Sequence, residues 1–149
     1  MYTDIRNMLE DLIKEGKSLE EALDISLRRF NPIYSLLELK LAEIGNGRAV
    51  GTFPFLKQFV NPNGTIHGGI IAAAVDQIGS VASWTSHRGE NQVTLELKIN
   101  YLKPLTEDES PFKVIGEVLK SGKTTIVTEV RIYGKSGSLL VAALGTWFK

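Results

Sequence analysis

The sequence predicts an α+β domain in which helices lie on one face of an antiparallel sheet. A long run of small and apolar residues over 66–86 has the period of a helix. Four segments after it, 92–101, 112–120, 124–133 and 138–148, have the character of strands. The connections between these strands are short, so neighbouring strands must be antiparallel.

The first thirty residues predict a helical hairpin. Residues 4–15 carry apolar side chains at helical spacing, and Gly16 follows as a stop. Ser18-Leu19-Glu20-Glu21 is a capping box that opens a second helix over 19–29, and Pro32 ends it. The hairpin is expected either to pack on the domain or to serve as a lid or a subunit contact.

A β-hairpin is expected between this extension and the long helix. Residues 34–43 alternate between apolar and polar side chains, which predicts a half-buried strand. Asn46-Gly47 is a hairpin turn, and 48–55 is the returning strand. The chain therefore divides into an N-terminal helical extension, 1–31, and a main domain, 32–149.

The composition restricts the classes of function. The 149 residues carry 17 basic and 17 acidic side chains, so no net charge attracts nucleic acid. Cysteine is absent, which excludes disulfides, thiolate ligands and a cysteine nucleophile. The N-terminus lacks the apolar core of a signal peptide, and residues 70–86 are too short for a membrane span. We expect a cytoplasmic protein without nucleic-acid or membrane partners.

Asp76 is the one residue with a formal charge in the long helix. Burying an unpaired charge is costly, so this carboxylate must be exposed, paired or functional. A helical wheel surrounds it with small residues where a surface helix would carry Lys and Glu: Ala72, Ala73, Gly79, Ser80 and Ser83. The helix is therefore expected to be covered on both sides, by the sheet and by a second surface.

The beginning of the same helix has the features of an oxyanion site. Gly68 and Gly69 lack Cβ atoms, and the N–H groups of a first helical turn are unpaired. Gly68 and Asp76 are separated by about 12 Å along the helix, whereas an acyl carbon must lie about 3 Å from both groups. One chain cannot satisfy this requirement, but two antiparallel copies of the helix can. The spacing therefore predicts a two-fold dimer.

The pattern Asn61-x-x-Gly64-Thr65-x-His67-Gly68-Gly69, followed by Asp76, resembles the hotdog-fold acyl-CoA thioesterases. The branch concerned contains the phenylacetic-acid-pathway thioesterases and thioesterase superfamily member 2. The resemblance covers residues 36–148, including Val93-Thr94-Leu95 and 100–104, and leaves the N-terminal helices outside. It implies a hotdog fold, in which an antiparallel sheet wraps a long helix. It also implies an acyl-CoA substrate and homodimers, commonly joined into homotetramers, with the sites at the dimer interface.

The resemblance also implies roles for single residues. Asp76 corresponds to the carboxylate that activates water or attacks the thioester, and the Gly68 N–H to the oxyanion donor. Asn61 and His67 resemble residues that shape the site beside the thioester. Thr94 stands where a relative has a serine that helps to place water, and a threonine can form the same hydrogen bond.

Several of these residues have structural interpretations as well. In the structural interpretation, Asp76 is a helix carboxylate that pairs with a buried polar group. His67 then fixes the loop before the helix by hydrogen bonding, and Asn61 is a turn residue. His67 and His87 form no ligand-spaced cluster, so we expect no metal and no cofactor. The candidates for binding substrate are the Gly69 amide and four basic side chains that would hold the coenzyme A phosphates: Lys103, Lys120, Lys123 and Arg88. The segment 121–123 is alternatively a solvated hairpin.

Two other functions compete with thioester hydrolysis. A hotdog hydratase or dehydratase needs a histidine base paired with a carboxylate across the site, whereas His67 is followed by Gly-Gly as in the thioesterases. A non-catalytic acyl-CoA sensor would bind coenzyme A esters without turnover. The net acidic first thirty residues make a DNA-binding element unexpected.

Overall fold

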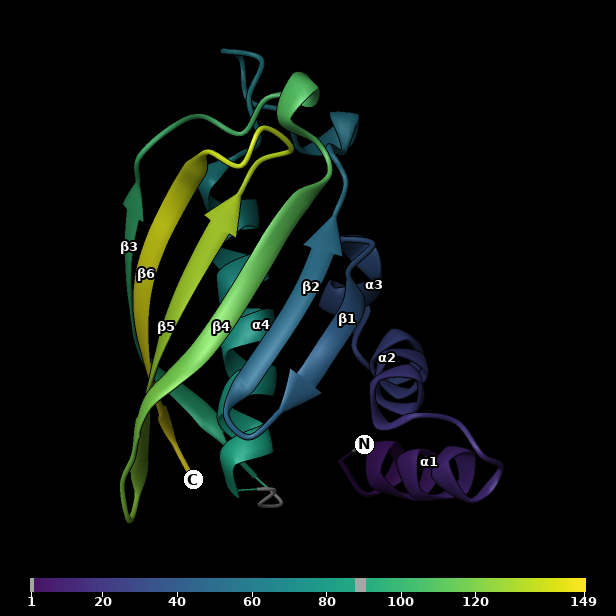
Figure 1. Ribbon diagram of the computed structural model, residues 1–149. Helices are drawn as coiled ribbons and strands as arrows, with labels where there is room; N and C mark the ends of the chain where they lie inside the picture. Colours follow the sequence, from purple (N-terminus) through teal and green to yellow (C-terminus); the bar gives the residue numbers. More distant parts are fainter. Residues whose placement is uncertain (1, 88–90) are drawn as a thin grey trace.

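The computed structural model, which describes residues 2–87 and 91–149, shows one antiparallel sheet wrapped around a long helix, α4 (Gly68–His87) (Figure 1). The strands are β1 (Lys40–Gly45), β2 (Arg48–Phe53), β3 (Val93–Tyr101), β4 (Phe112–Ser121), β5 (Thr125–Tyr133) and β6 (Leu139–Phe148). Their order is β1-β2-β4-β5-β6-β3, and all neighbouring pairs are antiparallel. The predicted α+β class is confirmed.

The buried face of α4 forms the centre of the core. Ala74, Val75 and Ile78 are fully buried and belong to one cluster with apolar side chains of the strands. The close approach of α4 to β4 favours a glycine, because a Cβ at Gly116 would lie 3.1 Å from both the Cβ of Ala82 and the carbonyl oxygen of Ile78. The sheet therefore covers one side of the helix, as predicted.

The sheet covers more of α4 than the helical wheel predicts. Gly79 and Ser83 were expected to face a second surface, but both are buried. A Cβ at Gly79 would lie 2.5 Å from the ring of Trp147 on β6. The prediction was wrong for these two residues because a twisted sheet curls around the helix. Ala73 and Ser80, from the same arc, are half-buried.

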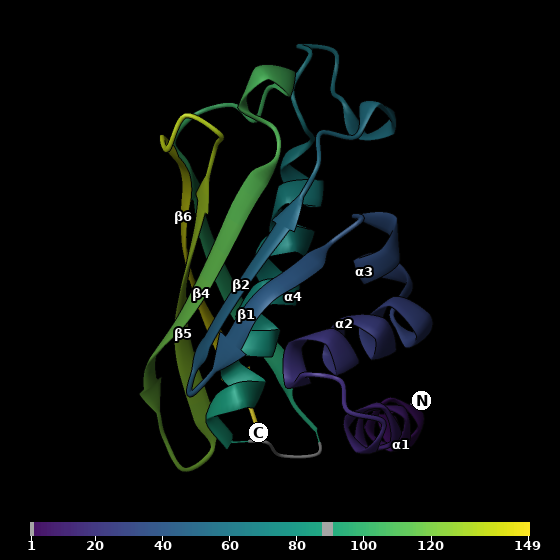
Figure 2. The same cartoon turned by 45° about the vertical axis from the view of Figure 1, so that its right-hand side comes forward.

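Three helices precede the sheet: α1 (Tyr2–Lys14), α2 (Leu19–Phe30) and α3 (Pro32–Leu36). α1 packs on α2, and α2 packs on β1 beside α4 (Figure 2). The predicted capping box is confirmed, since Ser18 Oγ accepts the N–H of Glu21 at 3.2 Å and the Glu21 carboxylate accepts the N–H of Ser18 at 3.3 Å. The predicted division of the chain falls at Asn31, which ends α2 and caps α3; it stays a prediction.

The segment 34–39 is not the strand that its alternation predicted. The side chain of Asn31 accepts the N–H of Tyr34 at 3.2 Å and so caps α3. The helix ends at Leu36, and Glu38 beyond its C-cap has a left-handed φ of 50°. The N–H of Leu39 bonds the Tyr34 carbonyl oxygen at 3.2 Å. The alternation reflects apolar side chains that enter the core from a helix end, and β1 begins only afterwards.

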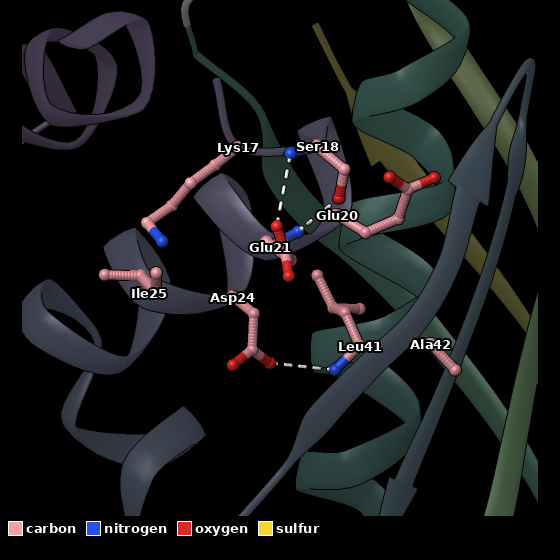
Figure 3. Close-up of a pocket in the computed structure, with 8 residues that line it drawn as sticks. All are labelled: Lys17, Ser18, Glu20, Glu21, Asp24, Ile25, Leu41 and Ala42. Atoms are coloured by element: carbon pink, nitrogen blue, oxygen red, sulfur yellow. Dashed lines mark hydrogen bonds between the residues drawn. The ribbon is translucent and has the colours of Figure 1, made fainter. Parts of the chain in front are cut away.

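Asp24 on α2 ties the N-terminal helices to the sheet (Figure 3). Its Oδ1 accepts hydrogen bonds from the Tyr34 hydroxyl and, at 2.8 Å, from the N–H of Leu41 on β1. Its Oδ2 accepts a hydrogen bond from Arg28 Nη2 at 3.1 Å. Burial of Tyr34, and then its bond to Asp24, raises the pKa of the hydroxyl, which therefore stays a neutral donor.

We expect Asp24→Ala to lower the free energy of unfolding by about 3 kcal/mol, because two donors lose their acceptor at about 1–3 kcal/mol each. Urea unfolding followed by circular dichroism measures this change. Asp11→Ala is the control, since Asp11 pairs with Lys14 at the surface with its side chain 70% exposed. The free energy of unfolding of this control should stay within about 0.5 kcal/mol of the wild-type value. Equal effects of the two substitutions would contradict the role of Asp24.

β3 is an edge strand with exposed apolar side chains. It pairs with β6 on one side, and a bulge between Thr94 and Glu96 shifts its register. Val93, Leu95 and Tyr101 are 59%, 57% and 50% exposed. An exposed apolar edge is a template for pairing with another chain.

Candidate active site

Asp76 lies in the middle of α4 and is half-buried. Its Oδ1 accepts a hydrogen bond from Thr94 Oγ1 on β3 at 2.7 Å. Within residues 2–87 and 91–149, the second oxygen, Oδ2, has no hydrogen-bond or salt-bridge partner. Thr94 thus orients the carboxylate and leaves one oxygen available to a water molecule or a substrate, as a general base or nucleophile requires.

The first turn of α4 has backbone N–H groups without a backbone partner in the described residues, those of Gly68 and Gly69. The N–H groups of Ile70 and Ile71 bond the His67 carbonyl oxygen at 3.0 and 3.1 Å. The N–H groups of Gly68 and Gly69 precede the first bonded N–H groups of the helix and lie at the positive end of the helix dipole. A Cβ at Gly69 would meet no atom within 4 Å. This turn therefore has the donors and the free space that a developing oxyanion needs.

Tyr101 supports this turn, a contact that sequence reasoning missed. Its hydroxyl donates a hydrogen bond to the Gly68 carbonyl oxygen at 2.9 Å, and a Cβ at Gly68 would lie 3.5 Å from its ring. Thr94 and Tyr101 are an odd number of residues apart, so a regular strand would point them to opposite faces. The bulge after Thr94 lets both side chains reach α4.

The loop before α4 is held by Asn61. Its side-chain oxygen accepts the N–H groups of Asn63 at 2.9 Å and Thr65 at 3.3 Å, and its amide donates to Thr65 Oγ1 at 2.9 Å. These bonds favour the structural interpretation of Asn61. The backbone N–H of His67 bonds the Phe59 carbonyl oxygen at 2.9 Å, and the residue is exposed. Direct catalytic roles for Asn61 and His67 stay predictions.

The basic candidates lie in two groups at opposite ends of the sheet (Figure 1). Lys103 follows β3 at the end where α4 begins, with its Nζ 3.5 Å from Ser138 Oγ. Lys120 and Lys123 are exposed at the hairpin between β4 and β5, at the other end. Arg88 lies outside the described residues. One chain therefore does not gather Lys103 with the hairpin lysines.

Two other kinds of feature are missing from the part of the chain that the structure describes. No group of three or more His, Cys, Asp and Glu side chains is placed to hold a metal ion. No helix is long and apolar enough to cross a membrane.

One chain contains two halves of the candidate site that do not meet. Thr94 is brought to Asp76, and Tyr101 is brought to Gly68. Gly68 and Asp76, however, belong to one continuous helix, about 12 Å apart along its axis. β3 contacts both halves and is exposed at its free edge.

The family model described as Thioesterase superfamily matches residues 63–141, which include both halves of the site. The match covers more than half of the chain, and the protein belongs to this family. The resemblance and the hotdog fold predicted from it are confirmed.

Relatives and solved structures agree with this assignment. A putative esterase of Saccharolobus solfataricus is 36% identical over 140 residues, which is 94% of each chain. An alignment of that length includes the whole of α2. Human acyl-coenzyme A thioesterase 13 is 29% identical over 126 residues, 85% of this chain and 89% of the relative.

Two crystal structures show the same architecture. Zebrafish thioesterase superfamily member 2 has a TM-score of 0.77 at 25% identity, over 87% of this chain and 96% of that one. A hypothetical thioesterase of Streptococcus pneumoniae, solved with coenzyme A, has a TM-score of 0.69 at 30% identity, over 74% and 86% of the two chains.

Proposed function

We propose that this protein is an acyl-CoA thioesterase, which hydrolyses an acyl-CoA to the free acid and coenzyme A. The proposal is carried by the geometry of Asp76. Thr94 orients its carboxylate through Oδ1, and Oδ2 remains available to a water molecule or a substrate. Family membership supports hydrolysis of a thioester. The relative named as an acyl-coenzyme A thioesterase and the S. pneumoniae structure with coenzyme A support the choice of substrate.

In this mechanism Asp76 takes a proton from a water molecule while the water oxygen bonds to the thioester carbonyl carbon, or the carboxylate itself attacks that carbon. The negative charge that develops on the carbonyl oxygen is stabilised by the N–H of the partner's Gly68. In the first case the carbon–sulfur bond then breaks, and the departing thiolate takes up the proton from Asp76. In the second case the bond breaks to leave an anhydride between the acyl group and Asp76. A water molecule hydrolyses this anhydride to the free acid and the Asp76 carboxylate, and the thiolate takes up the proton that is released. Thiolate is a good leaving group, so no strong general acid is required.

The proposed assembly is a homodimer whose two α4 helices run antiparallel, with the β3 edges joined. The exposed apolar residues of β3 support this pairing. In such a dimer, the end of one chain that carries Lys103 lies beside the partner's Lys120 and Lys123, so the two basic groups meet beside one site. Analytical ultracentrifugation distinguishes this dimer from the tetramer that the resemblance also implies.

Leu95→Lys is expected to produce monomers and to abolish hydrolysis, because a charge on the apolar edge opposes strand pairing. Sedimentation and thiol release from acyl-CoA measure the two effects. Leu119→Lys is the matched control, since Leu119 on β4 is 59% exposed against 57% for Leu95, and β4 is an interior strand. The control should remain dimeric and active. A fully active Leu95→Lys monomer would contradict the proposed assembly.

Thiol release from acetyl-, octanoyl-, palmitoyl- and phenylacetyl-CoA tests the activity itself. Hydrolysis of at least one of these by the wild-type protein is expected. Coenzyme A binding without any release would favour the sensor alternative. Hydration of an enoyl-CoA in place of hydrolysis would favour the hydratase.

A further inference from the structure

A cavity of about 570 Å³ lies between the N-terminal helices and the C-terminal half of α4. Leu9 on α1 and Leu23 on α2 form one wall, and Val81 and Trp84 on α4 form the opposite wall. Figure 2 shows α1 and α2 stacked beside this half of the helix. The N-terminal extension thus encloses a hollow that the main domain alone leaves open.

Four polar residues of the cavity lining are joined in pairs by hydrogen bonds. Asn31 Nδ2 donates to Gln77 Oε1 at 2.7 Å, and Gln92 Nε2 donates to the Ser80 carbonyl oxygen at 2.6 Å. These bonds satisfy groups that would otherwise need water or a polar ligand. A lining of this kind, mostly apolar with few available polar groups, suits an apolar guest.

Among the described residues that line the cavity, the charged ones lie at its rim. Arg6 and Glu10 pair at 3.1 Å on α1, and their side chains are 55% and 51% exposed. The described part of the lining therefore presents no charge to an apolar group inside the cavity.

The cavity reaches along α4 to the residues beside Asp76, since Gln77 lines it as well. Ser80 lines the cavity and follows Asp76 by four residues, which places the two Cβ atoms about 5–6 Å apart. Gln92 lines it from the strand side, just before Thr94, the residue that orients Asp76. From Asp76 to Trp84 the helix rises about 12 Å. Carbon–carbon bonds of about 1.5 Å at tetrahedral angles advance an extended chain by about 1.25 Å per carbon, so about 12 Å corresponds to about ten carbons.

We infer that this cavity binds the acyl group of the substrate, and that the substrate is an acyl-CoA with an apolar chain of medium length. The inference rests on the proposed thioesterase activity and adds its substrate class. A cavity of about 150 Å³ already takes up benzene, so 570 Å³ is ample for an apolar chain of this length. Each methylene that enters gains about fourfold in binding.

The test is a series of straight-chain acyl-CoAs from acetyl to palmitoyl, with kcat/KM measured for each. The wild-type value should rise with each added methylene to about ten carbons and then level off. Ile13 lines the cavity, and Ile13→Trp fills part of it. This variant should lower the decanoyl-to-acetyl ratio of kcat/KM by about tenfold or more. Trp84→Leu enlarges the cavity and should move the preferred length up by about two carbons.

Ile33→Trp is the matched control for the filled cavity. Ile33 on α3 is 44% exposed against 43% for Ile13, and it does not line the cavity. The decanoyl-to-acetyl ratio of kcat/KM in Ile33→Trp should stay within about twofold of the wild-type ratio.

Three outcomes would count against the acyl assignment or its basis. A decanoyl-to-acetyl ratio that neither Ile13→Trp nor Trp84→Leu changes would overturn the assignment and leave hydrolysis standing. A change of oligomeric state in Ile13→Trp, with an unchanged ratio, would identify the cavity as a subunit contact and overturn it as well. Absence of hydrolysis of every acyl-CoA by wild type would instead remove the proposed function.

Discussion

Asp76→Asn is expected to lower kcat/KM for every acyl-CoA substrate by about 10³-fold, within the range of about 10²–10⁴ that general bases contribute. Asparagine has nearly the same shape, and its side-chain oxygen can still accept the hydrogen bond from Thr94 Oγ1. The substitution therefore removes the proton acceptor and the nucleophile and leaves the local packing in place. Steady-state thiol release measures the effect.

Two controls accompany the Asp76 variant. Asp108→Asn changes an exposed acidic residue and should retain full activity. Circular dichroism and sedimentation should show that Asp76→Asn folds and assembles as wild type does. Activity of Asp76→Asn within about tenfold of wild type would mean that another group activates the water.

Gly68→Pro is expected to lower kcat by about 10²–10³-fold, the usual cost of losing one oxyanion donor. Proline removes the N–H of the residue, and it is tolerated at the first position of a helix, where that N–H makes no helical bond. Gly68→Ala is the matched control, because it keeps the N–H. Its Cβ would lie 3.5 Å from the Tyr101 ring, which is ordinary contact.

The comparison of the two Gly68 variants separates hydrogen bonding from shape. Alanine should retain most of the activity, and proline should lose most of it, with KM changing less than kcat in both. An equal loss of kcat in the two variants would mean that glycine is needed because a side chain does not fit there. The donor role of the Gly68 amide would then be rejected.

The elements with strong periodicity could be predicted from the sequence. α4 and the four later strands followed from helical spacing and alternation, and the capping box marked the start of α2. The segment 34–39 was misread because alternation alone does not distinguish a strand from the buried end of a short helix. The signals for α3, Asn31 before Pro32, were present but were read only as the end of α2.

The candidate site could be predicted where its parts are close in the sequence. Gly68 and Asp76 stand out because a single carboxylate and a pair of glycines interrupt an apolar helix. The contact of Tyr101 with Gly68 depends on a bulge and on strand pairing, neither of which local pattern reveals. The cavity beside α4 depends on how the N-terminal hairpin docks, which is again a tertiary property.

The most direct test of a site shared between two chains is a heterodimer of Asp76→Asn and Gly68→Pro, purified through two different tags. Each parent homodimer lacks one essential group in both sites. In the heterodimer, one site combines the native Gly68 of the first chain with the native Asp76 of the second. The heterodimer should therefore recover about half of the wild-type activity per dimer. A heterodimer as inactive as its parents would show that each chain builds its own site and would contradict the shared arrangement.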